Sequence, residues 1–215
     1  MKKRFYLACF RDNVGGNVAF HGVKGTSYVT DVNKAKTLSR EEAQRAWDMG
    51  REFDMPISAD HVDLLTTWKV DIQTIPRETV IDTGVSEWVA YQEGRYNGND
   101  VYWLTDKLPS LDFSQAKTFA LSDISIDDEY IVYIPRALAE TAKRQTFAMR
   151  DFNKRKMVQG AGLITPHHIR KEKRRKLNPK TRMNCPDCGK LHWQHNPHDF
   201  EGCNDVSCTS HNSWL

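Results

Sequence analysis

Short runs of aromatic and aliphatic residues, separated by turn residues, recur through the first part of the chain. Such runs predict β-strands at residues 5–10, 18–21, 87–92, 100–104 and 130–134. A Gly-Asn pair lies between the first and second runs, and another lies between the third and fourth. Glycine tolerates the positive φ of a tight turn, so the pattern predicts two β-hairpins.

Helical spacing begins at Ser39, where a capping box is predicted. The Ser39 hydroxyl can accept a bond from the Glu42 amide, and the Glu42 carboxylate can accept one from the Ser39 amide. The apolar spacing extends this helix to about residue 53, with Ala43, Trp47 and Met49 facing inward. A second short helix is predicted at residues 58–67, with Leu65 buried, and residues 68–73 alternate like a strand.

The two predicted hairpins resemble each other in sequence. At an offset of 82, Gly16-Asn17 aligns with Gly98-Asn99, and Phe20-His21 aligns with Tyr102-Trp103. After a one-residue adjustment, residues 31–38 align with residues 112–119, with Asp, Ala, Lys and Thr identical. We therefore expect an α+β body of two degenerate β-hairpin-plus-helix repeats that share one sheet. The repeats either form two equivalent clefts or only keep the turn residues of a duplicated fold.

Composition places the chain among globular proteins. Of its 215 residues, 39% are hydrophobic and 27% are charged, which excludes collagen, low-complexity and wholly disordered chains. No apolar run approaches the roughly 18 residues of a membrane span. The basic start, residues 2–4, is followed by an apolar run that Arg11-Asp12-Asn13 interrupts, unlike a signal peptide. We expect a soluble, cytoplasmic protein with no membrane partner.

Charge is distributed unevenly and divides the chain into three predicted regions. Residues 1–135, the repeat body, carry 15 Lys+Arg and 21 Asp+Glu, a net −6. Residues 136–182, a basic helix and linker, carry 15 basic and 3 acidic residues, a net +12. Residues 183–215 carry 1 basic and 4 acidic residues, a net −3. A strongly basic segment attached to an acidic body favours binding to a polyanion.

The basic region is predicted to begin with a helix from Arg136 to about Gly160, with a hinge at residues 163–166 and a second basic run at residues 167–176. Phosphates would neutralise its side chains and release counterions. The alternatives are a solvated helix without a partner and a surface that docks on an acidic protein. The candidate nucleic-acid-binding residues are Lys143, Arg144, Arg150, Lys154, Arg155, Arg170, Lys171, Lys173, Arg174, Arg175, Lys176, Lys180 and Arg182.

Four of the five cysteines are close together near the C-terminus. Cys185, Cys188, Cys203 and Cys208 form the pattern Cys-x2-Cys-x14-Cys-x4-Cys, which is within the spacing of structural Cys₄ zinc sites. The region 183–212 resembles the zinc-ribbon group. Four protein ligands leave Zn²⁺ no open position, so the predicted ion is structural.

Two alternatives remain open for this region. One of His192, His195, His198 and His211 could replace a cysteine ligand, or the cysteines could be reduced and unrelated. Trp193 is expected in the small core of the module, although it could instead stack on a nucleic-acid base.

Enzymatic motifs are absent from the sequence, and we expect no catalytic residues. The Walker A, Gly-x-Ser-x-Gly and His-Glu-x-x-His patterns are missing, and no His-x-Glu precedes the Cys-x-x-Cys pair as a zinc deaminase would require. A zinc-containing nuclease built on His167-His168 and Asn178 is a weaker alternative, because no matching carboxylates accompany them.

The body also resembles uncharacterised proteins of tailed bacteriophages. The residues that carry the resemblance are Gly16, Asn17, Tyr28, Thr30, Asp31 and Ala35. It implies a phage origin and therefore the bacterial cytoplasm, and it assigns no site. Together the features predict a non-catalytic DNA- or RNA-binding, or nucleoprotein-binding, factor with a structural zinc module, acting as an early or host-directed phage regulator. The alternative is a protein that docks on and inhibits a host complex.

Overall fold

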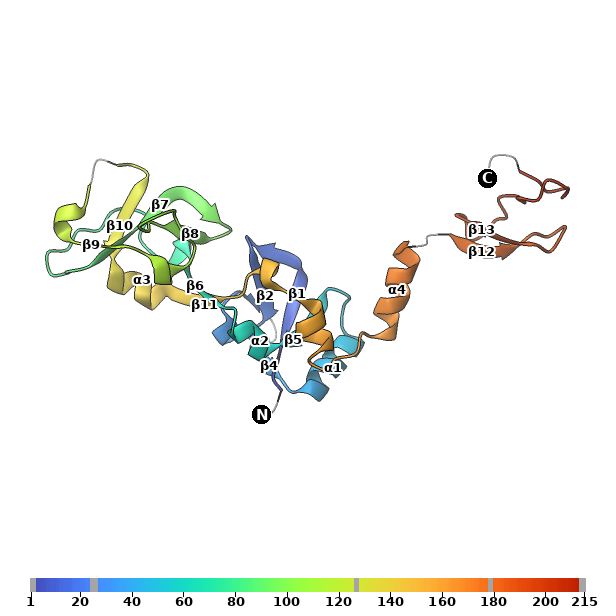
Figure 1. The fold of residues 1–215 in the computed structure, drawn as a ribbon, viewed down its shortest axis with the longest axis horizontal. Helices are drawn as coiled ribbons and strands as arrows, with labels where there is room; N and C mark the ends of the chain where they lie inside the picture. The colour runs from blue at the N-terminus through green and yellow to red at the C-terminus, as the bar shows by residue number, and fades with distance from the viewer. Residues whose placement is uncertain (1–2, 24–26, 126–127, 178–179, 213–215) are drawn as a thin grey trace. The chain divides into compact units, whose positions relative to one another are not determined.

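The computed structural model describes residues 3–23, 27–125, 128–177 and 180–212, except for the side chains at positions 12 and 175–177. Helices and strands are mixed along the chain, which confirms the α+β class. The chain forms two compact units, Met1–Ile164 and Thr165–Leu215. The boundary therefore falls inside the basic region 136–182 (Figure 1). No helix within the described residues has the length and apolar character needed to cross a membrane.

The first sheet is organised around strand β1 (Phe5–Val14). It pairs antiparallel with β2 (Asn17–His21), β4 (Thr37–Leu38) and β5 (Asp54–Ser58). Strand β3 (Tyr28–Val29) adds to the free edge of β2. Phe5, Phe20 and Ile57, from three of these strands, are fully buried, so this sheet has an apolar face packed into the interior.

The second sheet repeats this arrangement around strand β7 (Trp88–Asn97). It pairs antiparallel with β8 (Asp100–Trp103), β9 (Thr118–Phe119) and β10 (Ile131–Pro135). The core here is aromatic: Trp88, Tyr91 and Trp103 are completely buried, and Tyr91 and Trp103 pack edge to face at 5.9 Å.

The hairpin turns show which residues of the two halves are equivalent. Val14 pairs with Asn17 in the first hairpin, and Asn97 pairs with Asp100 in the second. The glycines that follow Val14 and Asn97 have φ of 59° and 64°, respectively. The hairpins therefore align one residue away from the predicted offset of 82. Gly15, not Gly16, is the counterpart of Gly98, so the predicted pairing of Gly16-Asn17 with Gly98-Asn99 is wrong. Phe20, not His21, is the counterpart of Trp103.

Beyond the hairpins, the alignment of residues 31–38 with residues 112–119 matches the structure. Asp31 caps a 3₁₀ turn, η1 (Val32–Lys34), by accepting a bond from the Asn33 amide. Asp112 caps η3 (Phe113–Gln115) in the same way, through the Ser114 amide. An Asp side chain bonded to the amide two residues on is a stable local turn that needs no distant contact.

The two halves do not share one sheet, so that prediction is wrong. The central strands β1 and β7 are each paired on both sides by strands of their own half, which leaves neither an edge for the other. Instead, β6 (Thr67–Val70) pairs antiparallel with β11 (Lys143–Thr146), and Figure 1 shows this pair between the two sheets.

The segments that follow β6 and β11 cross to the opposite half. The Ile72 amide donates to the Asn99 carbonyl at 2.9 Å, and the Met149 amide donates to the Gly16 carbonyl at 2.8 Å. Each half therefore binds the hairpin turn of the other. This exchange joins the two halves into one unit.

Helices in the first unit are shorter than the sequence predicts. Helix α1 (Arg40–Met49) begins at the predicted capping box, whose two hydrogen bonds are both present, but ends before residue 53 and leaves Met49 76% exposed. Helix α2 (Ala59–Asp63) ends before Leu65, which is also exposed. The predicted helix from Arg136 to Gly160 is wrong: α3 (Arg136–Ala142) leads directly into β11. Pairing with β6 overrides the helical preference of this segment.

The remainder of the first unit consists of short turns. They are η2 (Ile72–Thr74), η4 (Leu121–Asp123), η5 (Met149–Asp151) and a π-helical turn η6 (Arg155–Gln159). The second unit has helix α4 (His167–Leu177) and an antiparallel hairpin of β12 (Thr181–Asn184) and β13 (Leu191–Gln194). Long loops without regular structure follow β13.

Candidate metal centre and the basic residues

The four clustered cysteines converge on one point. Their sulfur atoms all lie within 4.8 Å of one another. The Sγ atoms of Cys185 and Cys208 are 3.6 Å apart, and so are those of Cys188 and Cys203. A disulfide requires about 2.05 Å. Thiolates around a tetrahedral ion with bonds of about 2.3 Å lie about 3.8 Å apart, so the cluster could hold a metal ion.

Two loops present these cysteines. The first joins β12 to β13, and its Gly189 has φ of 71°, which closes the loop tightly after Cys188. The Cys185 amide donates to the Lys190 carbonyl at 2.8 Å, and the Gly189 amide donates to the Cys185 carbonyl at 2.9 Å. In the second loop, the Cys208 amide donates to the Asp205 carbonyl at 3.0 Å. The backbone therefore fixes the direction of the thiols.

Hydrogen bonds to the sulfurs tune the thiols. Burial opposes ionisation of Cys185, but hydrogen bonds from the Cys188 and Asp187 amides and from the neighbouring Cys208 and Cys188 thiols together outweigh it and lower the pKa of this thiol to about 7. Burial raises the pKa of the Cys203 thiol to about 12 in the metal-free protein. A cation at the centre would favour the thiolate at both positions, because its charge would replace the solvation that burial removes.

His192 lies beside the cluster but does not belong to it. Its Nε2 is 3.2 Å from the Cys203 sulfur, and its ring is buried. If Cys203 binds a metal as a thiolate, which can only accept, Nε2 would be the donor in this contact, as in outer-shell partners of other metal sites. Another candidate, His211, is 3.0 Å from the Cys203 carbonyl through Nδ1. Neither His195 nor His198 joins the cluster among the described residues, so the four cysteines remain the candidate ligand set.

Strand β13 determines which side chains face the cluster. His192 and Gln194 are buried, whereas Leu191 and Trp193 are 42% and 50% exposed. Gln194 binds inside the module, where its Oε1 accepts from the Glu201 amide at 3.1 Å. The expectation that Trp193 belongs to the core is therefore wrong. Side chains alternate along a strand, so hydrogen bonding by the two polar residues places the indole on the outer face.

Polar contacts also join the two loops that carry the cysteines. Asp187 accepts from Thr209 at 2.8 Å and from Ser210. Lys190 forms an ion pair with Asp205, and this partner lowers the pKa of the Asp205 carboxyl below its usual range. These contacts, together with the cysteine cluster, join the two loops of a module with few apolar side chains to bury.

Two of the predicted phosphate-binding residues are engaged inside the first unit. Lys143 pairs with Glu140 and lies over the Trp68 ring at 4.9 Å. Arg144 bonds Asp100 at 2.7 Å and Thr30 at 3.2 Å, and its side chain is 12% exposed. Their charge is neutralised within the fold, so the structure assigns them a role in holding the first unit together.

Arg144 belongs to a buried polar network that the sequence analysis missed. Asp100 is fully buried and accepts from Arg144 on one oxygen and from Asn17 on the other, at 2.6 Å. Lys69 donates to Asn17 at 2.7 Å and lies 3.4 Å from Asp100. Burial lowers the pKa of Lys69. A lysine flanked by Trp68 and Val70 was the only signal in the sequence, and it does not identify partners so distant along the chain.

The remaining predicted basic residues are divided between the two units. Arg150 and Arg155 are exposed in the first unit, and Lys154 is half-buried there. Helix α4 exposes Arg170, Lys171, Lys173 and Arg174, and none of these four side chains forms an ion pair with a described residue. Lys180 and Arg182 are exposed before and on β12. The side chains of Arg175 and Lys176 lie outside the described residues, although both positions are in α4.

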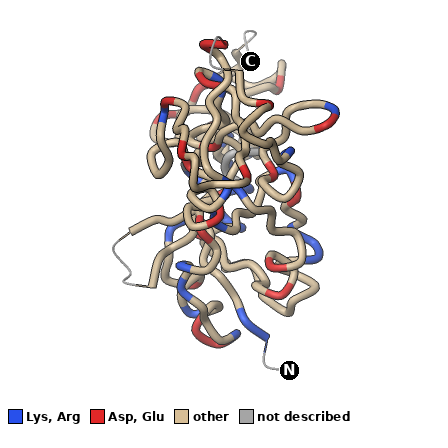
Figure 2. The backbone as a smooth tube through the Cα atoms, turned by 90° about the vertical axis from the view of Figure 1, so that its left-hand side faces the viewer, with Lys and Arg blue, Asp and Glu red and all other residues tan. Residues whose placement is uncertain are grey.

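The distribution of charge therefore changes once the fold is known. Figure 2 shows Lys and Arg interspersed with Asp and Glu along the backbone. Residues 1–164 contain 22 Lys+Arg and 23 Asp+Glu, nearly balanced, whereas residues 165–182 contain 8 Lys+Arg and 1 Glu. The excess of basic over acidic residues is therefore concentrated at the start of the second unit.

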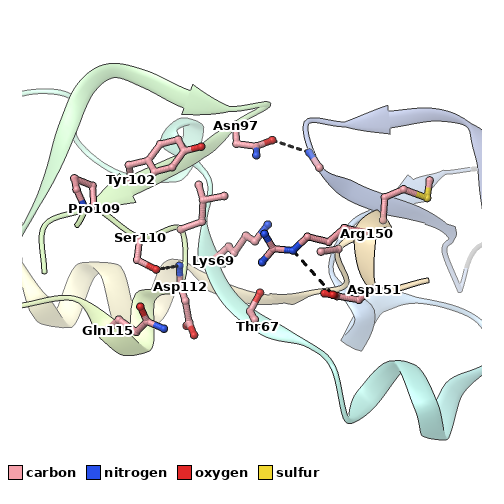
Figure 3. A pocket seen from close by; sticks show the side chains of 14 residues that line it. Thr67, Lys69, Asn97, Tyr102, Pro109, Ser110, Asp112, Gln115, Arg150 and Asp151 are labelled. Atoms are coloured by element: carbon pink, nitrogen blue, oxygen red, sulfur yellow. Dashed lines mark hydrogen bonds and ion pairs between the residues drawn. The ribbon is translucent and has the colours of Figure 1, made fainter. Parts of the chain in front are cut away.

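The first unit has a cavity of about 720 Å³ between its two halves (Figure 3). Lys69, Tyr102, Asp112, Arg150 and Asp151 are among its lining residues. The Lys69 ammonium is already bonded to Asn17, and Arg150 lies 4.0 Å from Asp151. Within the described lining we find no nucleophile paired with a base, so the cavity does not display a catalytic arrangement.

The nuclease alternative also lacks a second metal site within the described residues. The four cysteines are the only group of three or more His, Cys, Asp or Glu side chains placed there to share an ion. His167 and His168 are exposed on α4, and Asn178 lies outside the described residues. No protein-family model, curated protein or solved structure matches the chain.

Proposed function

We propose that the protein binds nucleic acid through its second unit, without catalysis, and that the cysteine cluster holds a structural Zn²⁺. The observation that carries the proposal is α4, whose four described cations, Arg170, Lys171, Lys173 and Arg174, are exposed and form no ion pair with a described residue, in the same compact unit as the cysteine cluster. Four cations on one helix of 11 residues repel one another in the free protein. Phosphates would remove that repulsion and release counterions.

Zinc is the proposed ion because of the donor set. Four thiolates are soft ligands, which favour Zn²⁺ or iron over Mg²⁺ or Ca²⁺, and tetrahedral S₄ geometry fits both soft candidates. Zn²⁺ has no redox chemistry and four cysteines leave it no open position, so its role would be to fold the module. Elemental analysis of the purified protein tests this directly: we expect one zinc per chain, and one iron with a visible thiolate-to-metal absorption would overturn the choice.

The binding proposal is tested by removing the charge of α4. The variant Arg170→Ala/Lys171→Ala/Lys173→Ala/Arg174→Ala keeps good helix formers, so α4 should persist. The matched control removes four exposed cations of the first unit, as Lys36→Ala/Arg45→Ala/Arg77→Ala/Lys107→Ala. Binding of zinc-loaded protein to duplex DNA, single-stranded DNA and an RNA hairpin is measured by fluorescence anisotropy at roughly 50 and roughly 200 mM salt.

We expect the α4 variant to bind more weakly and to lose about 3 to 4 units of the slope of log K against log salt, while the control resembles the wild type. Equal slopes for the α4 variant and the wild type would contradict the proposal. No binding by the wild type would favour the alternative, a protein-docking factor, whose partner should still be captured after nuclease treatment. A host-directed phage role rests only on the sequence resemblance. In that role, a host protein would bind the surface of the first unit.

A further inference from the structure

The outer face of the β12–β13 hairpin carries an unexplained pair, Arg182 and Trp193. The two residues are directly opposite in the antiparallel ladder. Trp193 is 50% exposed, and Arg182 is exposed as well. Side chains opposite each other on one face have Cβ atoms about 4.5 to 5.5 Å apart, so the indole and the guanidinium can contact the same small ligand.

Packing does not account for the exposed indole. The inner face of the hairpin is filled by His192 and Gln194, whose hydrogen bonds to Cys203 and to the backbone of the loop after β13 fix the register. Among the described residues, no Lys or Arg lies over the Trp193 ring, and Arg182 forms no ion pair. Both side chains are therefore left available on the surface.

We propose that Trp193 and Arg182 form a binding site for an unpaired base of single-stranded nucleic acid, with the base stacked on the indole and an adjacent phosphate on the guanidinium. This deepens the proposed function and rests on it. Stacking needs the open face of a base, which a duplex conceals, and it tolerates any base because every base has a π-face. The site therefore distinguishes single-stranded from double-stranded nucleic acid more than it distinguishes one sequence from another.

Charge around the pair fits this occupant. The cations of α4, with Lys180 and Arg182, precede Trp193 in the same unit. Among the acidic residues of the module, Asp205 pairs with Lys190 of the opposite loop, whereas Asp187 and Glu201 accept from neutral hydroxyl and amide donors inside the module. The basic residues that precede Trp193, and not residues 183–215 with their net −3, therefore supply the positive charge for the phosphates.

The test separates stacking from phosphate binding. Zinc-loaded wild type and the variants Trp193→Ala and Trp193→Phe are titrated with labelled oligothymidylate and with an abasic deoxyribose-phosphate oligomer of the same length. Val206→Ala is the control for truncating an exposed apolar side chain of this unit, since Val206 is 82% exposed. Metal content is measured for every variant, and because the indole is exposed we expect it to be unchanged.

We expect Trp193→Ala to weaken oligothymidylate binding about 5- to 150-fold, to leave the salt slope unchanged and to leave binding of the abasic oligomer unchanged. Trp193→Phe should restore most of the loss, and Val206→Ala should have no effect. Equal losses on both oligomers, or no loss on either, would overturn this site. If the α4 variant still weakens binding in that case, the proposed function stands without it. If the wild type binds neither oligomer, the stacking site fails, and the proposed function then depends on the titrations with duplex DNA and the RNA hairpin; no binding to those either overturns both proposals.

Discussion

The two compact units are stabilised by different means. The first, residues 1–164, buries large aromatic side chains from two sheets and joins its halves through a buried network around Asp100. The second exposes its Trp193 and Leu191, and gathers four thiols at its centre. A module this small cannot bury enough apolar surface to fold alone, so we expect a metal ion at the cysteine cluster to replace the missing core.

The largest expected effect comes from removing the metal. A chelator should unfold residues 181–212 and leave the first unit folded, because structural Zn²⁺ contributes on the order of 10 kcal/mol to folding of such modules. Limited proteolysis followed by mass spectrometry checks this: cleavage is expected within the metal module, while residues 3–164 survive. Simultaneous cleavage throughout the sheets of the first unit would show that the units are not independent.

The next effect concerns the network in the first unit. Asp100→Ala leaves the buried cations of Lys69 and Arg144 without their shared carboxylate, which should cost about 3 to 5 kcal/mol of unfolding free energy. Asp106→Ala is the control, since its side chain is 84% exposed, and it should change stability by no more than about 0.5 kcal/mol. Hydrogen exchange resolved by peptide measures both. A similar small change for the two variants would mean that the network does not hold the halves together.

A glycine comparison tests the close approach of the two hairpin turns. A Cβ at Gly15 would collide with Asn97, whereas one at Gly94 would meet no atom within 4 Å, and both glycines have positive φ. We expect Gly94→Ala to cost about 1 to 2 kcal/mol from backbone strain alone, and Gly15→Ala about 2 to 4 kcal/mol. Urea unfolding of the zinc-loaded protein, monitored by hydrogen exchange in peptides of the first unit, gives the difference in unfolding free energy between the two variants. Equal costs would indicate that the turns separate easily.

The smallest effect concerns the histidine beside the cluster. His192→Ala removes the hydrogen bond to Cys203 without removing a ligand, and should weaken metal affinity about 10- to 100-fold. Competition with a chromogenic chelator measures this, with His198→Ala as the control, because His198 is exposed and outside the cluster. A complete loss of metal would instead indicate that His192 is itself a ligand.

The sequence determined those features that depend on a few neighbouring residues. The capping box at Ser39 and Glu42, the Asp31 and Asp112 turns, the two hairpins and the four-cysteine set could all be predicted, because each is a local geometry with a characteristic spacing. The same holds for the concentration of basic residues between the body and the metal module.

Only the tertiary structure decided the features that depend on partners far along the chain. Residues 143–146 read as helix but form a strand because β6 offers an edge. Arg144 reads as a phosphate contact but neutralises Asp100, since a buried carboxylate must be paired. Trp193 reads as core but lies outside, because two hydrogen-bonded polar residues fill the interior. A sequence shows which residues can be buried or paired, whereas long-range contacts select the ones that are.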